Sequence, residues 1–272
     1  MFMKRSLIAL VSLLLFAVAG CSSMNLASST SPVTDRILAS GELRVGMSGN
    51  QPPFNMKNRA GKLMGMDVDL AVGLARTMGV EVKLVSMPFQ ELLPALEKGE
   101  IDIVLSGMTM TTERNLKVAF AGPYFISGKA ALTKSPSLAA ASEPSDVNKK
   151  ARMTVLAGST SELFAKRSLP NVELVPVDDY DAAIEMVLND EVEALIADYP
   201  VCILALYQHP DTELVTTVST FSFEPIGVAL SSDAHLLTNA VQNYFSLLEG
   251  TGTLERLRAL WFDNSAWVQD LP

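Results

Sequence analysis

The sequence predicts an α/β protein of two lobes, and three observations support this prediction. Strand-like and helix-like apolar patterns alternate along the chain in two separate series. A polar stretch at residues 135–152 lies between the two series. The chain has 272 residues, of which 49% are hydrophobic and 19% charged, so it is long enough for two folded domains and most of it is not disordered.

The first series has five elements in which strands and helices take turns. We expect them at residues 43–46 (strand), 68–78 (helix), 81–85 (strand), 91–98 (helix) and 101–105 (strand). Apolar residues recur at helical spacing in the helix at 68–78, and Gly79 follows where a left-handed cap is favoured. This order indicates a parallel sheet with right-handed crossovers.

The second series repeats the pattern. Its elements are expected at residues 153–157 (strand), 161–168 (helix), 172–175 (strand), 180–188 (helix) and 193–197 (strand). In open parallel sheets a ligand lies beyond the carboxyl ends of the strands. The residues that follow each predicted strand are therefore the candidates for a binding site.

The first twenty residues have the pattern of an export signal. Lys4 and Arg5 precede an apolar run that is too short to span a membrane comfortably. The run ends in Val18-Ala19-Gly20-Cys21, which resembles the lipobox of bacterial lipoproteins, where the chain is cut before a cysteine that then carries acyl chains such as palmitate. We expect removal of residues 1–20 and lipid attachment at Cys21. The alternative is an ordinary secretory signal in which Cys21 has no part.

A flexible tether is expected at residues 21–35, which are rich in serine and threonine. No later apolar run is long enough to span a membrane, so the lipid would anchor the folded part without crossing the bilayer. Ser22 stands after the lipid cysteine where Asp would favour the inner membrane. Under the sorting rule of such lipoproteins this favours the outer membrane, with the folded part in the periplasm.

Charge and rare residues exclude several classes of protein. The chain has 21 Lys+Arg against 30 Asp+Glu, a net charge of −9 that becomes −11 once Lys4 and Arg5 are removed, so nucleic acid is not an expected partner. The two cysteines, Cys21 and Cys202, and the two histidines, His209 and His235, provide neither a disulfide framework nor a metal site. No cofactor is expected. If Cys21 carries lipid, Cys202 is the one remaining thiol.

Two loops that follow predicted strands contain groups able to bind a carboxylate. After residues 101–105 come Gly107, several hydroxyl side chains and Arg114, whose guanidinium can hold a carboxylate through two hydrogen bonds. Alternatively, Thr111 or Thr112 caps a helix and Arg114 is solvated. After residues 153–157, Ser159 and Glu162 have capping-box spacing, so a ligand-binding turn and a plain helix start are both open.

Asp198 follows the last predicted strand and needs a partner if it is buried. A ligand ammonium would serve, and so would a backbone N–H or a nearby lysine. Together, Arg114, the Ser159–Thr160 turn and Asp198 complement the carboxylate and ammonium of an α-amino acid. Phe54 and Phe89 offer apolar faces for its side chain, although core packing is the commoner fate of phenylalanine.

Several motifs occur in an order found in one family. The segment Gly65-Met66-Asp67-Val68-Asp69-Leu70 has a glycine, a bulky residue and two alternating acids before an amphipathic helix. Leu92-Leu93-Pro94-Ala95-Leu96, Phe120-Ala121-Gly122-Pro123-Tyr124 and Gly252-Thr253-Leu254 follow it. Across residues 36–262 the chain resembles the bacterial extracellular solute-binding proteins of family 3, which serve ABC importers of polar amino acids. We interpret Asp67 and Asp69 as support for a turn and a helix start.

The resemblance implies a type II periplasmic-binding-protein fold. Two lobes, each a mostly parallel sheet flanked by helices, would be joined by a two-stranded hinge and close over a solute. Lobe 1 would comprise residues 36–127 and 227–272, and lobe 2 residues 128–226. The polar stretch at 135–152 would then be a loop inside lobe 2. We expect a monomer that meets the permease of an ABC transporter.

The resemblance also implies roles for individual residues. Arg114 would bind the ligand carboxylate and Asp198 its ammonium group. The other expected ligand contacts are Gly107, Met108 and Thr109 in lobe 1, Ser159 and Thr160 in lobe 2, Phe89 as an aromatic wall, and Gln51. Gln51 and Met66 depart from the family, because aromatic residues are usual at both positions. The sequence therefore does not predict which amino acid or related solute is bound.

The leading functional hypothesis is an extracytoplasmic lipoprotein that captures an amino acid, or a similar small zwitterion or carboxylate, and delivers it to an ABC transporter. One alternative is an enzyme on the same scaffold, similar to cyclohexadienyl or arogenate dehydratases. No histidine follows a predicted strand and no nucleophile elbow or phosphate loop occurs, so we do not expect an enzyme. A second alternative is a sensor that signals to a receptor when closed.

Overall fold

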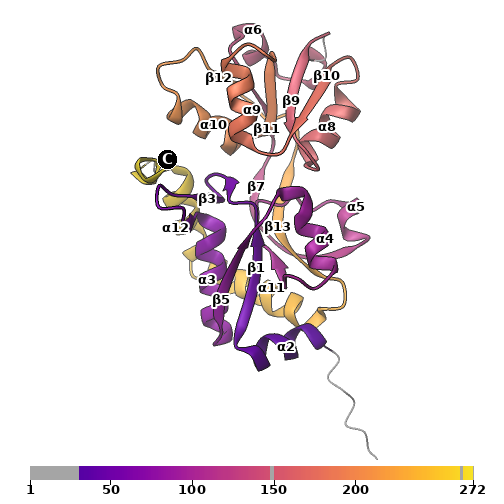
Figure 1. Cartoon of the computed structure of the whole chain (residues 1–272), viewed down its shortest axis with the longest axis vertical. Helices are drawn as coiled ribbons and strands as arrows, with labels where there is room; N and C mark the ends of the chain where they lie inside the picture. The colour runs from indigo at the N-terminus through magenta and orange to yellow at the C-terminus, as the bar shows by residue number, and fades with distance from the viewer. Residues whose placement is uncertain (1–30, 148–149, 264–265, 272) are drawn as a thin grey trace, which may run out of the picture.

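The computed structural model describes residues 31–147, 150–263 and 266–271. Two lobes lie one above the other and are joined by strands β7 and β13 (Figure 1). The predicted α/β fold class is confirmed, and each lobe contains one five-stranded sheet. The expected signal peptide, Cys21 and most of the expected tether lie outside the described residues.

The first lobe is built on a sheet with the strand order β5-β1-β6-β13-β7. Its strands are β1 Glu42–Met47, β5 Glu81–Ser86, β6 Ile103–Val104, β7 Val118–Ser127 and β13 Glu224–Ser231. The pairs β5–β1 and β1–β6 are parallel, whereas β13 is antiparallel to both β6 and β7. A small sheet at the edge of the cleft consists of β2 Asn50–Gln51, β3 Asn55–Lys57 and β4 Leu63–Met64.

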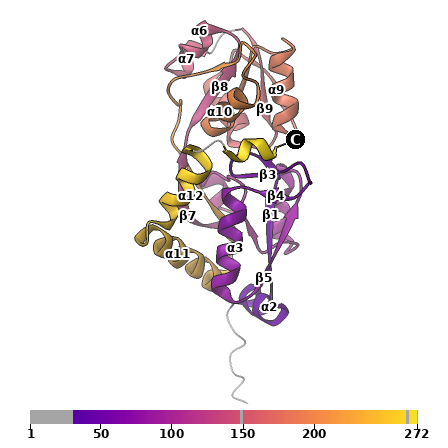
Figure 2. The same cartoon turned by 90° about the vertical axis from the view of Figure 1, so that its left-hand side faces the viewer.

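Helices cover the first sheet and bury its apolar face. They are α2 Pro32–Ser40, α3 Met66–Met78, η2 Phe89–Glu91, α4 Leu92–Glu97, α5 Thr112–Asn115, α11 His235–Gly250, α12 Thr253–Arg258, η3 Ala259–Asp263 and η4 Ala266–Asp270. α3 packs on β5 and α11 on β7, and together they enclose a core that contains Leu43, Leu70 and Phe245 (Figure 2). Gly79 ends α3 in the left-handed conformation, as predicted.

The second lobe has a sheet with the order β10-β9-β11-β8-β12. The strands are β8 Lys129–Thr133, β9 Arg152–Leu156, β10 Glu173–Val177, β11 Ala194–Asp198 and β12 Val215–Thr216. The helices are α6 Pro136–Ala139, α7 Pro144–Val147, α8 Thr160–Ser168, α9 Tyr180–Leu188 and α10 Tyr199–Gln208. The sheet again has two parallel and two antiparallel pairs.

In each sheet four of the five strands run in the same direction, so the expectation of a mostly parallel sheet is confirmed, and the exceptions are β13 in lobe 1 and β8 in lobe 2. Two other sequence expectations need correction. The polar stretch at residues 135–152 connects β8 to β9 within one sheet, so it does not separate the lobes. The tether does not extend to residue 35, because α2 begins at Pro32, which suits the first turn of a helix.

The connection between the lobes consists of two strands. β7 passes through Gly128 into β8, and the chain returns through residues 217–223 into β13. A Cβ atom on Gly128 would lie 2.4 Å from the carbonyl oxygen of Ser222, so only glycine allows the two segments to approach this closely. The lobe boundaries after residues 127 and 226 remain our proposal.

The lobes are in contact across the cleft. One hydrophobic cluster contains Leu92 and Met108 from the first lobe together with Tyr180 and Leu195 from the second. On another side, η3 and η4 lie beside α10 of the second lobe (Figures 1 and 2). None of the helices in the described ranges is long and apolar enough to cross a bilayer.

Candidate functional site

Arg114 lies in the short helix α5, at the mouth of the cleft. Thr111 accepts a hydrogen bond from the backbone N–H of Arg114 and so caps α5, which confirms the helix-cap interpretation of that threonine. The guanidinium is not simply solvated. Its Nη1 donates to the carbonyl oxygen of Thr109 at 2.8 Å, its Nη2 donates to that of Gly158 in lobe 2 at 3.4 Å, and its Cζ lies 5.7 Å from the centre of the Phe89 ring.

The electrostatic surroundings of Arg114 combine burial with nearby negative charge. Burial lowers the pKa of the guanidinium, while the carboxylates of Asp198, Glu224 and Glu113 act in the opposite direction. Arginine remains protonated in proteins, so the site holds a permanent cation. Among the described residues, no carboxylate lies within ion-pair distance of it.

The second lobe presents the start of helix α8 to the cleft. Ser159 Oγ accepts from the backbone N–H of Glu162 at 3.2 Å and donates to the carbonyl of Leu156 at 2.6 Å, so its hydroxyl is used by the helix cap. Thr160 is the residue that reaches lobe 1, where its Oγ1 lies 3.1 Å from Thr109 Oγ1. The capping-box alternative thus accounts for Ser159, and Thr160 forms the contact between the lobes.

Asp198 ends β11 and has an ion-pair partner that the sequence left open as an alternative. Lys129 Nζ donates to Asp198 Oδ1 at 2.6 Å and to Thr160 Oγ1 at 2.7 Å. Glu224 Oε2 lies 3.5 Å from the same ammonium group, and Ser222 donates to the other oxygen of Glu224. Sequence reasoning did not identify Lys129 or Glu224 as site residues. The available signal was a lysine at the head of the apolar run Ala130-Ala131-Leu132.

The loop after β6 forms the floor of the cleft in lobe 1. Gly107 has φ +54°, and a Cβ atom there would lie 2.6 Å from Gln51 Nε2. This nitrogen donates to the carbonyl of Gly107 at 3.4 Å, whereas the buried Gln51 Oε1 has no hydrogen-bond partner among the described residues. The side chain of Met108 packs in the core cluster shared by the lobes. Phe54, by contrast, is fully buried in the core of lobe 1.

Asp67 has a larger role than support of a helix start. It is fully buried, and it accepts hydrogen bonds from Tyr124 Oη at 2.6 Å, Asn55 Nδ2 at 2.8 Å and the backbone N–H of Gly107 at 3.0 Å. Burial raises the pKa of this carboxyl group to about 6, although the three hydrogen bonds oppose the shift. Asp67 therefore fixes the loop that carries Gly107 and Thr109.

A pocket of about 300 Å³ opens beside Arg114, between the lobes. It is lined by Thr111, Glu113, Arg114, Gly158, Ser159, Thr160, Glu162, Leu163 and Lys166. Its size is at the lower end of the roughly 300–1,000 Å³ found for small-molecule sites. An exposed ion pair between Glu113 and Arg167 crosses between the lobes at its rim, with the two charged atoms 2.7 Å apart.

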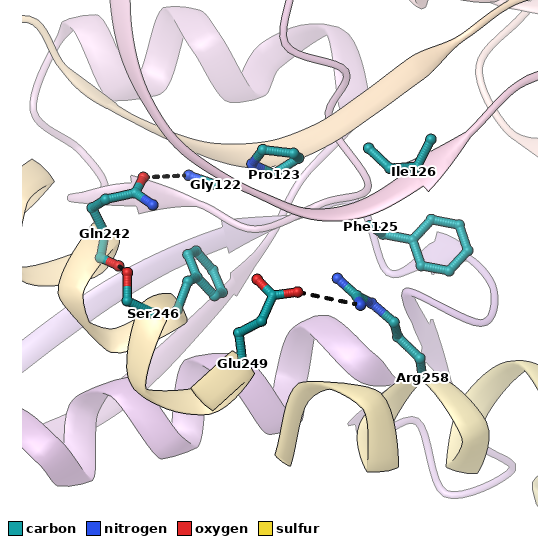
Figure 3. Close-up of a pocket in the computed structure, with 9 residues that line it drawn as sticks. Gly122, Pro123, Phe125, Ile126, Gln242, Ser246, Glu249 and Arg258 are labelled. Carbon is teal, nitrogen blue, oxygen red and sulfur yellow. Dashed lines mark hydrogen bonds and ion pairs between the residues drawn. The ribbon is translucent and has the colours of Figure 1, made fainter. Parts of the chain in front are cut away.

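A second pocket, of about 520 Å³, lies on the outside of lobe 1 (Figure 3). There β7 faces α11 and α12, Gln242 accepts from the backbone N–H of Gly122, and Glu249 pairs with Arg258 (Figure 3). None of the predicted site residues lines it. Within the described residues no group of His, Cys, Asp and Glu side chains could hold a metal ion.

Comparison with known proteins identifies the family. The model of the bacterial extracellular solute-binding proteins, family 3, matches residues 43–264. This chain belongs to that family. The family 3 resemblance inferred from the sequence motifs is thereby confirmed, and the protein has a solute-binding role outside the cytoplasm.

Two relatives and one solved structure illustrate which proteins this chain is similar to. The L-cystine-binding protein TcyJ of Escherichia coli is 29% identical, covering 90% of this chain and 91% of TcyJ. The cyclohexadienyl dehydratase of Pseudomonas aeruginosa is 25% identical over 84% of this chain and 85% of the enzyme. The structure of a putative binding component of an ABC transporter from Wolinella succinogenes, complexed with lysine, has a TM-score of 0.80 and 32% identity, covering 84% and 99% of the chains.

Proposed function

We propose that this protein is a lipid-anchored periplasmic binding protein that captures a small carboxylate-bearing solute between its lobes and delivers it to the permease of an ABC transporter. The observation that carries the proposal is the guanidinium of Arg114. It lies between the lobes beside a pocket, donates only to backbone carbonyl groups in the described part of the chain, and has no carboxylate partner there. A half-buried cation in this state is a receptor for an anion.

Binding and closure would work together at this site. Arg114 belongs to lobe 1, and Gly158 and Thr160 belong to lobe 2, so a carboxylate held by Arg114 would contact both lobes at once. A ligand that makes contacts to both lobes only in the closed form shifts the population toward that form. The permease would then receive the closed, loaded protein.

The relatives support this class of solute. TcyJ is named for L-cystine, and the Wolinella structure holds lysine, both of which are amino acids with a carboxylate. For this chain we propose a solute of similar size that is bound through the same kind of group. The named alternative, a sensor that signals to a receptor, predicts no loss of solute uptake when the gene is deleted.

The dehydratase relative makes a catalytic role the second candidate. Such chemistry needs an acid that is free to donate a proton in the cleft. Asp198 and Glu224, whose charges act on Arg114, both face the ammonium group of Lys129. Glu113 and Glu162, which line the pocket, pair with Arg167 and Lys166. We therefore propose binding without turnover. Incubation of the purified protein with prephenate and arogenate tests this, and formation of phenylpyruvate or phenylalanine would establish the enzyme instead.

Titration calorimetry with a panel of amino acids and related carboxylates tests the binding site. The Arg114→Gln variant should lose at least about 100-fold in affinity, because two charge-assisted hydrogen bonds of roughly 1.5–3 kcal/mol each are removed. Arg76, an exposed arginine in the last turn of α3, provides the matched control, and Arg76→Gln should bind normally. Full affinity of Arg114→Gln would contradict the proposed site.

The anchor is tested separately, because Cys21 lies outside the described residues. The unaltered precursor should be labelled by palmitate and sediment with the membranes. A Cys21→Ser variant should lose the label. If the Cys21→Ser protein were still labelled by palmitate and still sedimented with the membranes, the lipobox interpretation would be wrong. The binding proposal would not be affected.

A further inference from the structure

Lys129 occupies the position at which the sequence motifs place a ligand ammonium group. It begins β8 and lies directly opposite Asp198 in the antiparallel ladder with β11. The lysine side chain is fully buried, and its ammonium group is surrounded by oxygen atoms of Asp198, Thr160 and Glu224 at 2.6, 2.7 and 3.5 Å. Three oxygen atoms match the three N–H donors of an ammonium group.

This arrangement does not depend on closure of the lobes. Lys129 and Asp198 are cross-strand neighbours in one sheet, and Thr160 begins α8, which packs on that sheet. Rotation about the hinge moves these three residues as a unit. A solute that enters the open cleft therefore meets an Asp198 carboxylate that is already paired.

An amino acid would place a second ammonium group on this carboxylate. The two like charges would share one Asp198 side chain in a site with little water, where their repulsion is strong. Displacing Lys129 is also unfavourable, because a fully buried ammonium group would then have only Glu224 as a counter-charge. The pair therefore disfavours ligands that bear a positive charge at the α-carbon.

We propose that Lys129 takes the place of the ligand ammonium group, and that the solute is a small carboxylic acid with a hydroxyl, an oxo group or hydrogen at the α-carbon. This inference rests on the proposed function, because Arg114 must hold the carboxylate. Thr160 Oγ1 accepts from Lys129, so the threonine hydroxyl hydrogen remains for Thr109 or for an oxygen of such an acid.

The net charge of the site does not by itself favour amino acids or carboxylic acids that lack the ammonium group. Arg114 and Lys129 balance Asp198 and Glu224, so these four side chains sum to zero before a ligand enters. An amino acid adds no net charge. A carboxylic acid adds one negative charge close to the N-terminus of α8, where negative charge is stabilised. The occupied Asp198 carboxylate is what distinguishes the ligands.

Ligand pairs that differ only at the α-carbon test the inference by titration calorimetry. The pairs are alanine with lactate, alanine with pyruvate, glutamate with 2-oxoglutarate, and phenylalanine with phenylpyruvate. For whichever pair binds, we expect the hydroxy or oxo acid to bind at least about tenfold more tightly than the amino acid. Loss of both members in Arg114→Gln would show that the binding takes place at the proposed site.

The variant Lys129→Met frees Asp198 and should reverse the preference by at least about tenfold in favour of the amino acid. The matched control is Lys134→Met. Lys134 follows the same strand but pairs with Asp190, away from the cleft, so its removal should leave the preference unchanged. A lysine with a purely structural role would change thermal unfolding in Lys129→Met without changing the ratio of the two affinities.

Because Lys129→Met leaves a buried carboxylate unpaired, a double variant with Asp198→Asn provides a second measurement. It removes both charges, and the preference should then fall toward equal binding. The inference is overturned if the unaltered protein prefers the amino acid, or if the preference persists in a folded Lys129→Met protein and in the double variant. If neither member of any pair binds the unaltered protein, the proposed function fails, which is a different result.

Discussion

Replacing Asp67 by asparagine tests whether one buried carboxylate holds the binding loop in place. The three groups that donate to Asp67, from Tyr124, Asn55 and Gly107, lie 2.6–3.0 Å from its oxygen atoms. The substituted side chain would have nearly the same size, but its amide nitrogen would face groups that are themselves donors. At least one of these groups would lose its partner, at a cost of about 1–3 kcal/mol.

The size of the pH effect follows from the titration of this group. Burial raises the pKa of Asp67 from an ordinary 3.8 to about 6. Because the folded state holds this proton more tightly than the unfolded chain, the stabilising contribution is complete below the unfolded pKa and is lost as pH rises through 6. Relative to Asp67→Asn, the free energy of unfolding of the unaltered protein should therefore be about 2 kcal/mol larger at pH 4.5 than at pH 7.5.

Urea denaturation of both proteins at the two pH values measures this difference, and comparison of the pair cancels the contributions of the other carboxyl groups. Asp211, which lies exposed in a turn after α10, provides a control, because Asp211→Asn makes the same change of side chain at an exposed position. A difference between the unaltered protein and Asp67→Asn that is equal at both pH values, or larger at pH 7.5, would refute the reasoning.

Three further predictions concern Ser159, Gly128 and Cys202. Ser159→Ala removes the cap of α8 and should lower the free energy of unfolding by about 1 kcal/mol in urea denaturation. Gly128→Ala places a methyl group 2.4 Å from a backbone carbonyl oxygen, so it should destabilise the hinge by about 1–3 kcal/mol and lower the melting temperature. Cys202 is buried and its pKa is raised to about 12, so iodoacetamide at pH 8 should modify it in the Cys21→Ser protein only after unfolding.

The two βαβαβ series could be predicted because their signals are local. Hydrophobic periodicity places a helix such as α3, and the cap at Gly79 ends it. The hinge strands lack such a signal. β7 contains Gly122 and Pro123, which interrupt a strand pattern, and it pairs with β13 some hundred residues later. The antiparallel pairs in each sheet thus depend on contacts between distant segments.

The candidate site was predictable where it follows the parallel strands. Arg114, Thr160 and Asp198 come from three such loops, and the structure brings them to one cleft. Lys129 and Glu224 come instead from the hinge segments, where the apolar periodicity of the sequence predicted no strand. The interpretation of Ser159 was open because one hydroxyl spacing serves both a helix cap and a ligand, and only the contacts to Leu156 and Glu162 decide it.

The site is linked to the hinge through Asp67. Its carboxylate bonds the Gly107 N–H in the ligand loop and the hydroxyl of Tyr124, which lies in hinge strand β7. An acidic residue in the first turn of an exposed helix contributes about 0.3–1 kcal/mol through the helix dipole, which is too little to explain burial of the whole carboxylate. The donors on both sides of Asp67 do explain it. The loop that presents Thr109 to lobe 2 is therefore held to a strand that connects the lobes, so we expect loosening of this link to weaken solute binding as well as stability.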